Sequence, residues 1–154
     1  MIEKVDINSV SVSEAALVHS VSWKESHRSF CTTEFVEAHS PENQKVYFEN
    51  KIANGASVYI LRKDDGKTIA VVSVDGDLIG DLYVLPEYRC MGYGTKLLDF
   101  AISVCTGTPR LYVLSSNKRA EKLYLKRGFM RNGKVLKLSD TLDEYEYELS
   151  DSEK

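Results

Sequence analysis

The sequence predicts an α/β protein of the α+β type, in which helices flank a mixed and mostly antiparallel sheet with a central parallel pair of strands. Apolar residues at helical spacing fill much of the first third, and three β-rich runs separated by tight turns follow. A strand–loop–helix–strand order over residues 81–114 then requires two parallel strands, because parallel pairing needs a crossover connection. We expect one domain over residues 1–149 and a frayed tail over residues 150–154.

After a short strand within residues 2–7, the sequence predicts three helices. The first is expected to run from Ser11 or Ser13, each a suitable N-cap, to about His27. The second is a short segment around Phe35 and Val36, and the third should run from Pro41 to about Ile52. Ser40 is the expected cap of the third helix, and Gly55 is placed to end it.

Three strands joined by tight turns should then form an antiparallel meander. They are expected over residues 57–62, 68–74 and 78–84, with Asp64-Asp65-Gly66 and Asp75-Gly76 at the turns. Gly80 lies inside the third strand, where glycine weakens pairing unless it marks a bulge, and it is our candidate for a bulge. The remaining expected elements are a helix to about Cys105, a strand at 110–114, a helix that Gly128 ends, and an antiparallel pair at 129–137 and 144–149.

The loop that contains Arg89, Gly92 and Gly94 connects the meander to the next helix. Such a junction points backbone N–H groups and the positive end of a helix dipole at one spot, which favours a phosphate or pyrophosphate. A P-loop is set aside because Gly94 is followed by Thr95-Lys96 in the wrong order, and a dinucleotide fingerprint because the third glycine is missing. An ordinary strand-to-helix turn that needs a positive φ is the alternative.

Two motifs carry a resemblance to a known family. Arg89-x-x-Gly92-x-Gly94 resembles the acyl-CoA pyrophosphate loop, [Arg/Gln]-x-x-Gly-x-[Gly/Ala], of the GNAT acetyltransferase superfamily. The later segment Asn117-x-x-Ala120-x-x-x-Tyr124-x-x-x-Gly128-Phe129 is similar to that family's Asn…Ala…Tyr…Gly-Phe segment. Both occur in the family's order. The resemblance implies the GNAT fold, whose central parallel strands splay apart at a bulge.

The resemblance also implies acetyl-CoA as cosubstrate and no metal ion. The pantetheine arm would lie between the splayed strands, and the pyrophosphate would lie on the loop. The implied cofactor-binding residues are Leu82, Val84, Arg89, Cys90, Met91, Gly92, Tyr93, Gly94, Thr95, Asn117 and Tyr124. Most members carry glycine and a basic residue where this chain has Cys90 and Met91, and this difference lowers the positive charge of the loop.

The implied chemistry is attack of a neutral amine on the thioester carbonyl, followed by departure of a thiolate. The expected proton donor to the sulfur is Tyr124, with packing of its ring as the alternative role. A backbone N–H of Val84 or Leu85 would polarise the carbonyl. No general base is assigned firmly, because a water chain can remove the proton; Asp81 is the leading candidate, and the others are Asp77, Tyr83, His27, Glu144 and Glu146. Four residues fall in the helical region that covers the acceptor side in the family: Trp23, His27, Phe30 and Tyr47. They are expected to be core residues more often than pocket residues.

Composition limits the remaining classes. A net charge of −3 argues against a nucleic-acid-binding face across the molecule, and no stretch has the apolar length of a membrane span. Three widely spaced cysteines fit reduced thiols in a cytoplasmic protein better than a disulfide framework or a zinc site. The expected partners are acetyl-CoA and an amine, and the oligomeric state stays open, with a homodimer as one option.

Two functions of different classes fit these observations. The first is an N-acetyltransferase that acts on a primary amine of a small molecule or of a protein. The second is a non-catalytic acyl-CoA-binding sensor or interaction module. Tyr124 and Asn117 favour the enzyme, whereas Cys90 and Met91 in the loop mildly favour the sensor.

Overall fold

A computed structural model of the chain describes residues 1–150, so the tail expected at 150–154 lies, except for Ser150, outside the described residues. The elements are β1 (Ile2–Lys4), α1 (Ser11–His27), α2 (Thr33–Glu37), α3 (Pro41–Ala53), β2 (Ser57–Arg62), β3 (Thr68–Asp75), β4 (Leu78–Val84), the 3₁₀ turn η1 (Pro86–Tyr88), α4 (Tyr93–Val104), β5 (Arg110–Leu114), α5 (Lys118–Arg127), β6 (Met130–Lys137) and β7 (Asp143–Glu148). Their order and type agree with the prediction.

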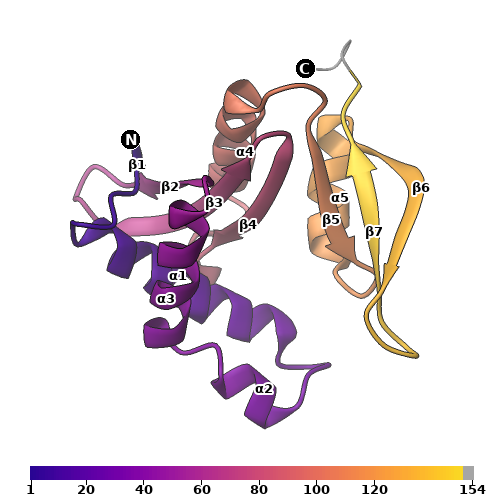
Figure 1. Ribbon diagram of the computed structural model, residues 1–154, viewed down its shortest axis with the longest axis horizontal. Coiled ribbons are helices and arrows are strands. Elements are labelled where there is room, and N and C mark those ends of the chain that lie inside the picture. Colours follow the sequence, from indigo (N-terminus) through magenta and orange to yellow (C-terminus); the bar gives the residue numbers. More distant parts are fainter. Residues whose placement is uncertain (151–154) are drawn as a thin grey trace.

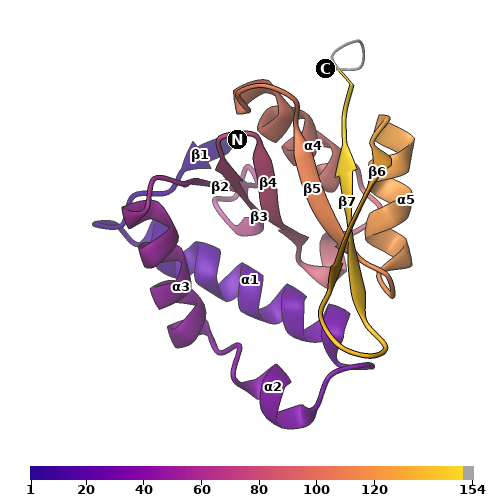
Figure 2. The ribbon, with the colours of Figure 1, turned by 45° about the vertical axis from the view of Figure 1, so that its right-hand side comes forward.

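The strands form one mixed sheet in the order β1-β2-β3-β4-β5-β7-β6. Every neighbouring pair is antiparallel except β4 and β5, which run parallel as the crossover through α4 requires. Only one residue pair, Leu78 with Arg110, joins these two strands. Beyond that pair they separate, and the sheet opens into a V between β4 and β5 (Figures 1 and 2). The α+β fold with a splayed parallel pair is therefore confirmed.

Strand β3 lies at the centre of the core, and seven of its eight residues are buried. Helix α1 packs on it from one side and α4 from the other, which explains why the sequence of β3 is almost continuously apolar. Helix α3 packs on α1, and α5 lies beside the β5-β7-β6 part of the sheet (Figure 2). The two arms of the V thus carry different helices.

The bulge lies in β4, but one residue later than the sequence suggested. Val71 pairs with Tyr83 and Ser73 pairs with Gly80, so Asp81 and Leu82 together oppose a single residue of β3. Asp81 carries the positive φ of 53°, and Gly80 does not. A Cβ on Gly80 would come within 3.1 Å of the Ser73 hydroxyl, so this glycine provides room for the side chains around Asp81 rather than the bulge itself.

Most helix starts follow the sequence. The hydroxyl of Ser40 accepts a hydrogen bond from the N–H of Asn43, with Pro41 in the first turn. The expected serine cap of α1 is wrong: Val10 occupies the N-cap position, and the hydroxyl of Ser11 accepts a bond from the N–H of Asp6 instead. Within residues 1–150, none of the helices combines the length and apolar character that a membrane span requires.

Candidate active site

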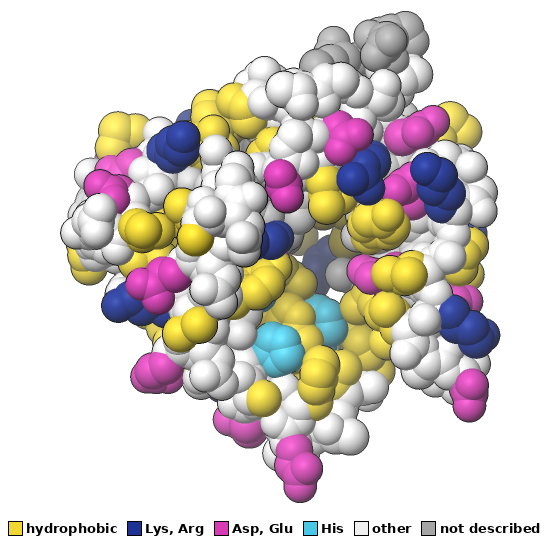
Figure 3. Space-filling model, in the orientation of Figure 1, with side chains coloured by type: hydrophobic (Ala, Val, Ile, Leu, Met, Phe, Trp, Pro, Cys, Tyr) yellow, Lys and Arg dark blue, Asp and Glu magenta, His cyan; other side chains and the backbone are white. Residues whose placement is uncertain are grey.

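The V between β4 and β5 contains two cavities that meet. The smaller has a volume of about 400 Å³ and the larger of about 580 Å³. Figure 3 shows a hollow in this face of the molecule, with hydrophobic and histidine side chains along its wall. The residues that line both cavities are Leu82, Tyr83, Asn117, Ala120 and Tyr124. A ligand in one cavity can therefore reach a ligand in the other.

The smaller cavity begins at the N-terminus of α4. Gly92 is the N-cap with φ 88°, a conformation that side chains other than glycine rarely adopt. The first α-helical bond runs from the N–H of Lys96 to the carbonyl of Gly92, so the N–H groups of residues 93–95 have no partner within the helix. Together with the helix dipole, these donors form an anion site.

Nine of the residues expected to bind the cofactor line this smaller cavity: Leu82, Val84, Arg89, Cys90, Gly92, Gly94, Thr95, Asn117 and Tyr124. Met91 and Tyr93 do not line it. The Met91 side chain is largely exposed, and the Tyr93 ring packs against Tyr88. The side chains of these two residues are therefore not placed to contact a ligand in this cavity.

Cations from α5 that the sequence analysis did not single out also line the smaller cavity. They are Arg119, Lys122 and Lys126. Their spacing of three and four residues puts them on one face of a helix, so the periodicity could have revealed a basic stripe. Sequence alone did not show that this stripe faces the loop. With Arg89 these residues suit a ligand that carries several phosphate charges.

Glu25, near the end of α1, forms ion pairs with Arg89 and Arg119. Its carboxylate is 2.5 Å from Nη1 of Arg89 and 3.5 Å from Nη2 of Arg119. The Ser26 hydroxyl accepts further bonds from both guanidinium groups. An anionic ligand at the loop would compete with Glu25 for the same donors.

The backbone of β4 distinguishes between the two expected carbonyl donors. The N–H of Leu85 donates to the carbonyl of Ile69 at 2.9 Å, so it is already used within the sheet. Consecutive N–H groups of an antiparallel strand point to opposite sides. The N–H of Val84 therefore points away from β3 and toward the open side of the V. Of the two, Val84 is available to a ligand.

Tyr124 and Asn117 lie where the cavities meet. Oδ1 of Asn117 caps α5 by accepting from the N–H of Ala120. The Tyr124 ring packs against Phe129, and its hydroxyl has no hydrogen-bond partner among the described residues. Burial raises the pKa of Tyr124, and the negative charge of Asp81 raises it further, so the hydroxyl keeps its proton.

Asp81 is at the centre of a buried polar network. Its carboxylate accepts hydrogen bonds from Nε2 of His19 at 3.1 Å, the Tyr47 hydroxyl at 2.9 Å, the Lys51 ammonium and the Ser73 hydroxyl at 2.7 Å. Burial raises the pKa of Asp81, but the hydrogen bonds and charges of His19 and Lys51 outweigh burial and hold it far below its usual range. A carboxylate in this state is a weak base.

The larger cavity is lined by aromatic side chains from α1, α2 and the segments next to them. The Trp23 ring is stacked between His27, with centroids 4.0 Å apart, and His39, at 3.4 Å. Each histidine uses Nδ1 to donate to the backbone carbonyl four residues before it, which leaves Nε2 of each as a hydrogen-bond acceptor. Burial lowers the pKa of His27, and the bond to the Trp23 carbonyl offsets this only partly. Phe30 and Phe35 complete this wall.

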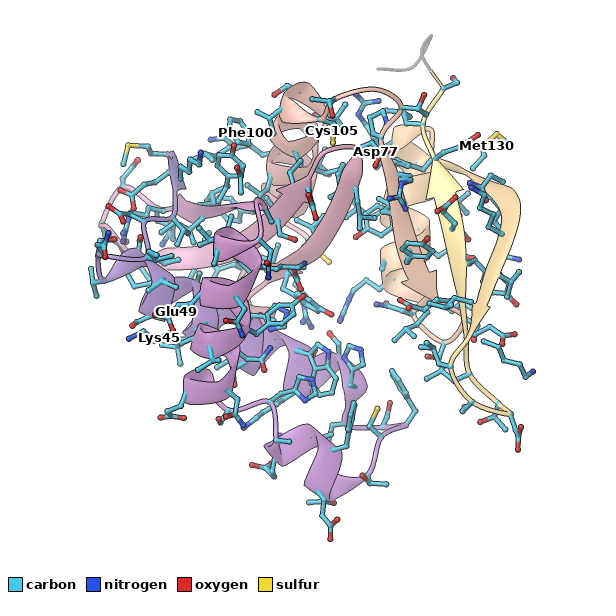
Figure 4. The ribbon with its side chains drawn as sticks, viewed as in Figure 1. Lys45, Glu49, Asp77, Phe100, Cys105 and Met130 are labelled. Atoms are coloured by element: carbon cyan, nitrogen blue, oxygen red, sulfur yellow. The ribbon has the colours of Figure 1, made fainter. Side chains whose placement is uncertain are left out.

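The other base candidates differ in position. Glu144 on β7 lines the larger cavity and is half-buried, and its carboxylate has no hydrogen bond or ion pair to the described residues. Burial raises the pKa of this carboxyl. Glu146 is buried and paired with Arg110 and Asn132, and it lines neither cavity. Asp77 pairs with Arg110 at the closed end of the V, near Cys105 (Figure 4). Among the described residues no cluster of His, Cys, Asp or Glu is arranged to hold a metal ion.

The model of the acetyltransferase (GNAT) family matches residues 22–129, which include the loop, α4 and α5. The chain belongs to the GNAT acetyltransferase family. GNAT members are acyltransferases, and the cavity at the α4 N-terminus lies within the matched residues. Comparison with curated proteins gives no match.

Solved GNAT structures share the fold over nearly the whole chain. The PaiA N-acetyltransferase of Thermoplasma acidophilum, determined with coenzyme A, is 22% identical and superposes with a TM-score of 0.70 over 95% of this chain and 96% of its own. YncA of Salmonella typhimurium, determined with acetyl-CoA, has 16% identity and a TM-score of 0.71, with coverage of 97% and 92%. A variant of the spermidine N-acetyltransferase SpeG of Vibrio cholerae has 14% identity and a TM-score of 0.66, with coverage of 97% and 94%. At these identities the likeness shows the fold alone.

Proposed function

We propose that this GNAT protein is an acetyl-CoA-dependent N-acetyltransferase that transfers the acetyl group to a primary amine by direct attack on the thioester. One observation carries the proposal: a cavity walled by cations and a helix N-terminus meets a second, mostly apolar cavity at Tyr124. A phosphorylated thioester entering from the first side and an amine from the second would meet where β4 and β5 separate. PaiA and YncA, whose structures contain coenzyme A and acetyl-CoA, support a CoA thioester as the cosubstrate.

In this proposal different groups of the protein bind different parts of acetyl-CoA. Arg89 and the first N–H groups of α4 hold the pyrophosphate, and the cations of α5 neutralise further phosphate charge. The N–H of Val84 donates to the carbonyl oxygen, on which negative charge develops during attack. We assign Asp81 a positioning role, because its network holds the bulge that aims the backbone of β4 into the V.

In the proposed transfer, the acceptor ammonium first loses one proton, and its nitrogen then bonds to the carbonyl carbon. The carbon–sulfur bond breaks, and the Tyr124 hydroxyl gives its proton to the departing sulfur. The attacking nitrogen loses a second proton, which restores Tyr124 directly or through water. The products are the amide, the free thiol and one proton released to solvent.

Binding and kinetics together test this function. Coenzyme A at 100 times its Kd should stabilise the fold by about 2.7 kcal/mol, or roughly 5–10 °C in Tm for a chain of this size. Thiol release from acetyl-CoA should depend on an amine, and double-reciprocal plots should intersect, because both ligands bind before transfer. Parallel plots would indicate an acetyl-enzyme intermediate and would refute direct attack of the amine on the thioester. A Tm shift without amine-dependent thiol release across a panel of amines would instead favour the acyl-CoA sensor.

A further inference from the structure

The larger cavity has a chemical character that selects among amines. The acidic side chains that line it are Asp81 and Glu144, and no lysine or arginine within residues 1–150 lines it. Asp81 is neutralised by its ion pair with Lys51 and is surrounded by donors. Glu144 is therefore the one lining carboxylate that has no partner among the described residues. The cavity offers one negative charge to an incoming cation.

The rest of the lining is largely apolar and partly exposed. Phe30, Phe35 and Leu138 are 38%, 52% and 48% exposed, although each is a large hydrophobic side chain at the cavity. They belong to the α1–α2 region and to the β6–β7 connection, so segments far apart in the sequence both contribute apolar surface to the cavity. Exposed hydrophobic groups that converge on a concave site indicate a ligand with an apolar body.

We propose that the acceptor is a primary monoamine whose single positive charge is held by Glu144 and whose apolar, planar body packs against Phe30, Phe35 and Leu138. This inference rests on the proposed function, because it takes the larger cavity as the acceptor side. A volume of about 580 Å³ accommodates an aromatic ring with a short aminoalkyl chain. A polyamine would bring three or four charges into a lining that offers one unpaired carboxylate, and it would leave the aromatic wall uncovered.

Trp23 provides a direct readout of this cavity. It is the only tryptophan of the chain, and it lies in the cavity wall between two histidines. Amines can therefore be titrated into the protein saturated with coenzyme A while Trp23 fluorescence is followed. Three probes separate the contributions: 2-phenylethylamine has one charge and a ring, ethylamine has the charge alone, and spermidine has several charges and no ring.

We expect 2-phenylethylamine to bind roughly 10- to 100-fold more tightly than ethylamine, the factor expected for burying a phenyl ring. Spermidine should produce no saturable change in the same concentration range. Phe35→Ala should weaken 2-phenylethylamine and leave ethylamine unchanged. Glu144→Gln should weaken the binding of both amines by a similar factor, roughly tenfold. The control is Glu49→Gln: Glu49 lies on α3 (Figure 4) and is absent from the lining of both cavities, so this variant should weaken the binding of neither amine.

The outcomes distinguish this inference from the proposed function. Equal affinity for the two monoamines, tighter binding of spermidine, or an unchanged affinity in Glu144→Gln would overturn the monoamine proposal while acetyl transfer could still be measured. Saturable binding of 2-phenylethylamine without any thiol release from acetyl-CoA would support the cavity assignment and overturn the enzymatic function. Phe35 is exposed on a short surface helix, so its alanine variant should keep the fold, and coenzyme A binding checks this.

Discussion

Replacing Tyr124 with phenylalanine should lower turnover and leave stability nearly unchanged. Phenylalanine keeps the ring contact with Phe129, whose centroid is 6.0 Å away. The lost hydroxyl makes no hydrogen bond to the described residues, and it belongs to a side chain that lines both cavities, where water can reach it. Its removal should therefore change the free energy of unfolding by less than about 1 kcal/mol. That limit corresponds to roughly 2–4 °C in Tm for a domain of this size.

Turnover should fall in the same variant. General acid catalysis contributes roughly 10²–10⁴-fold, and we expect a loss near the lower end, because the raised pKa of Tyr124 makes it a weaker acid. The loss should shrink with an acyl donor whose leaving thiol is more acidic. The measurements are kcat, the Kd of coenzyme A and Tm, with Tyr59→Phe as control, since Tyr59 packs on Phe100 and lines neither cavity.

A wild-type kcat in Tyr124→Phe would refute the proton-donor role and leave the tyrosine as a packing residue. A fall of several degrees in Tm would refute the stability argument, because it would mean that the hydroxyl has a stabilising partner. A loss in kcat together with an equal loss in coenzyme A affinity would assign Tyr124 to cofactor binding instead.

Three further predictions concern the loop and the network. Gly92→Val should abolish the Tm shift caused by coenzyme A while the protein still folds, because valine at φ 88° strains the first turn of α4, and an unchanged shift would place the phosphate site elsewhere. Glu25→Gln should tighten coenzyme A binding by roughly 2- to 5-fold at low salt, because it removes an exposed competitor for Arg89; a weaker affinity would contradict this. The depressed pKa of Asp81 makes its contribution to stability fully present above about pH 4 and lost as the pH falls below that value. The Tm of the wild type should therefore drop more steeply than that of Asp81→Asn between pH 4 and pH 2, and parallel curves would count against the network.

Several features could be predicted from the sequence because short-range chemistry decides them. Ser40 and Pro41 start α3 for a local reason, since the serine cap and the fixed φ of proline act within one helical turn. Gly92 adopts a positive φ at the helix entry for a similar local reason. The parallel pairing of β4 with β5 followed from the crossover through α4, a rule of connection that depends on element order alone.

Other features depended on contacts between residues far apart in the sequence. The bulge falls at Asp81 and not at Gly80 because His19, Lys51 and Ser73 surround that carboxylate, and no local pattern brings those three together. The pairing of Glu25 with Arg89 spans 64 positions in the same way.

The larger cavity shows the same limit most clearly. The sequence left Glu144 as one of several base candidates and favoured the core for Trp23 and Phe30. Only the folded sheet brings the β7 carboxylate into the same cavity as the aromatic residues of the α1–α2 region. The reason is physical: local sequence determines where strands and helices begin and end, whereas the shape and charge of a cavity depend on which side chains the packed elements leave exposed to one another.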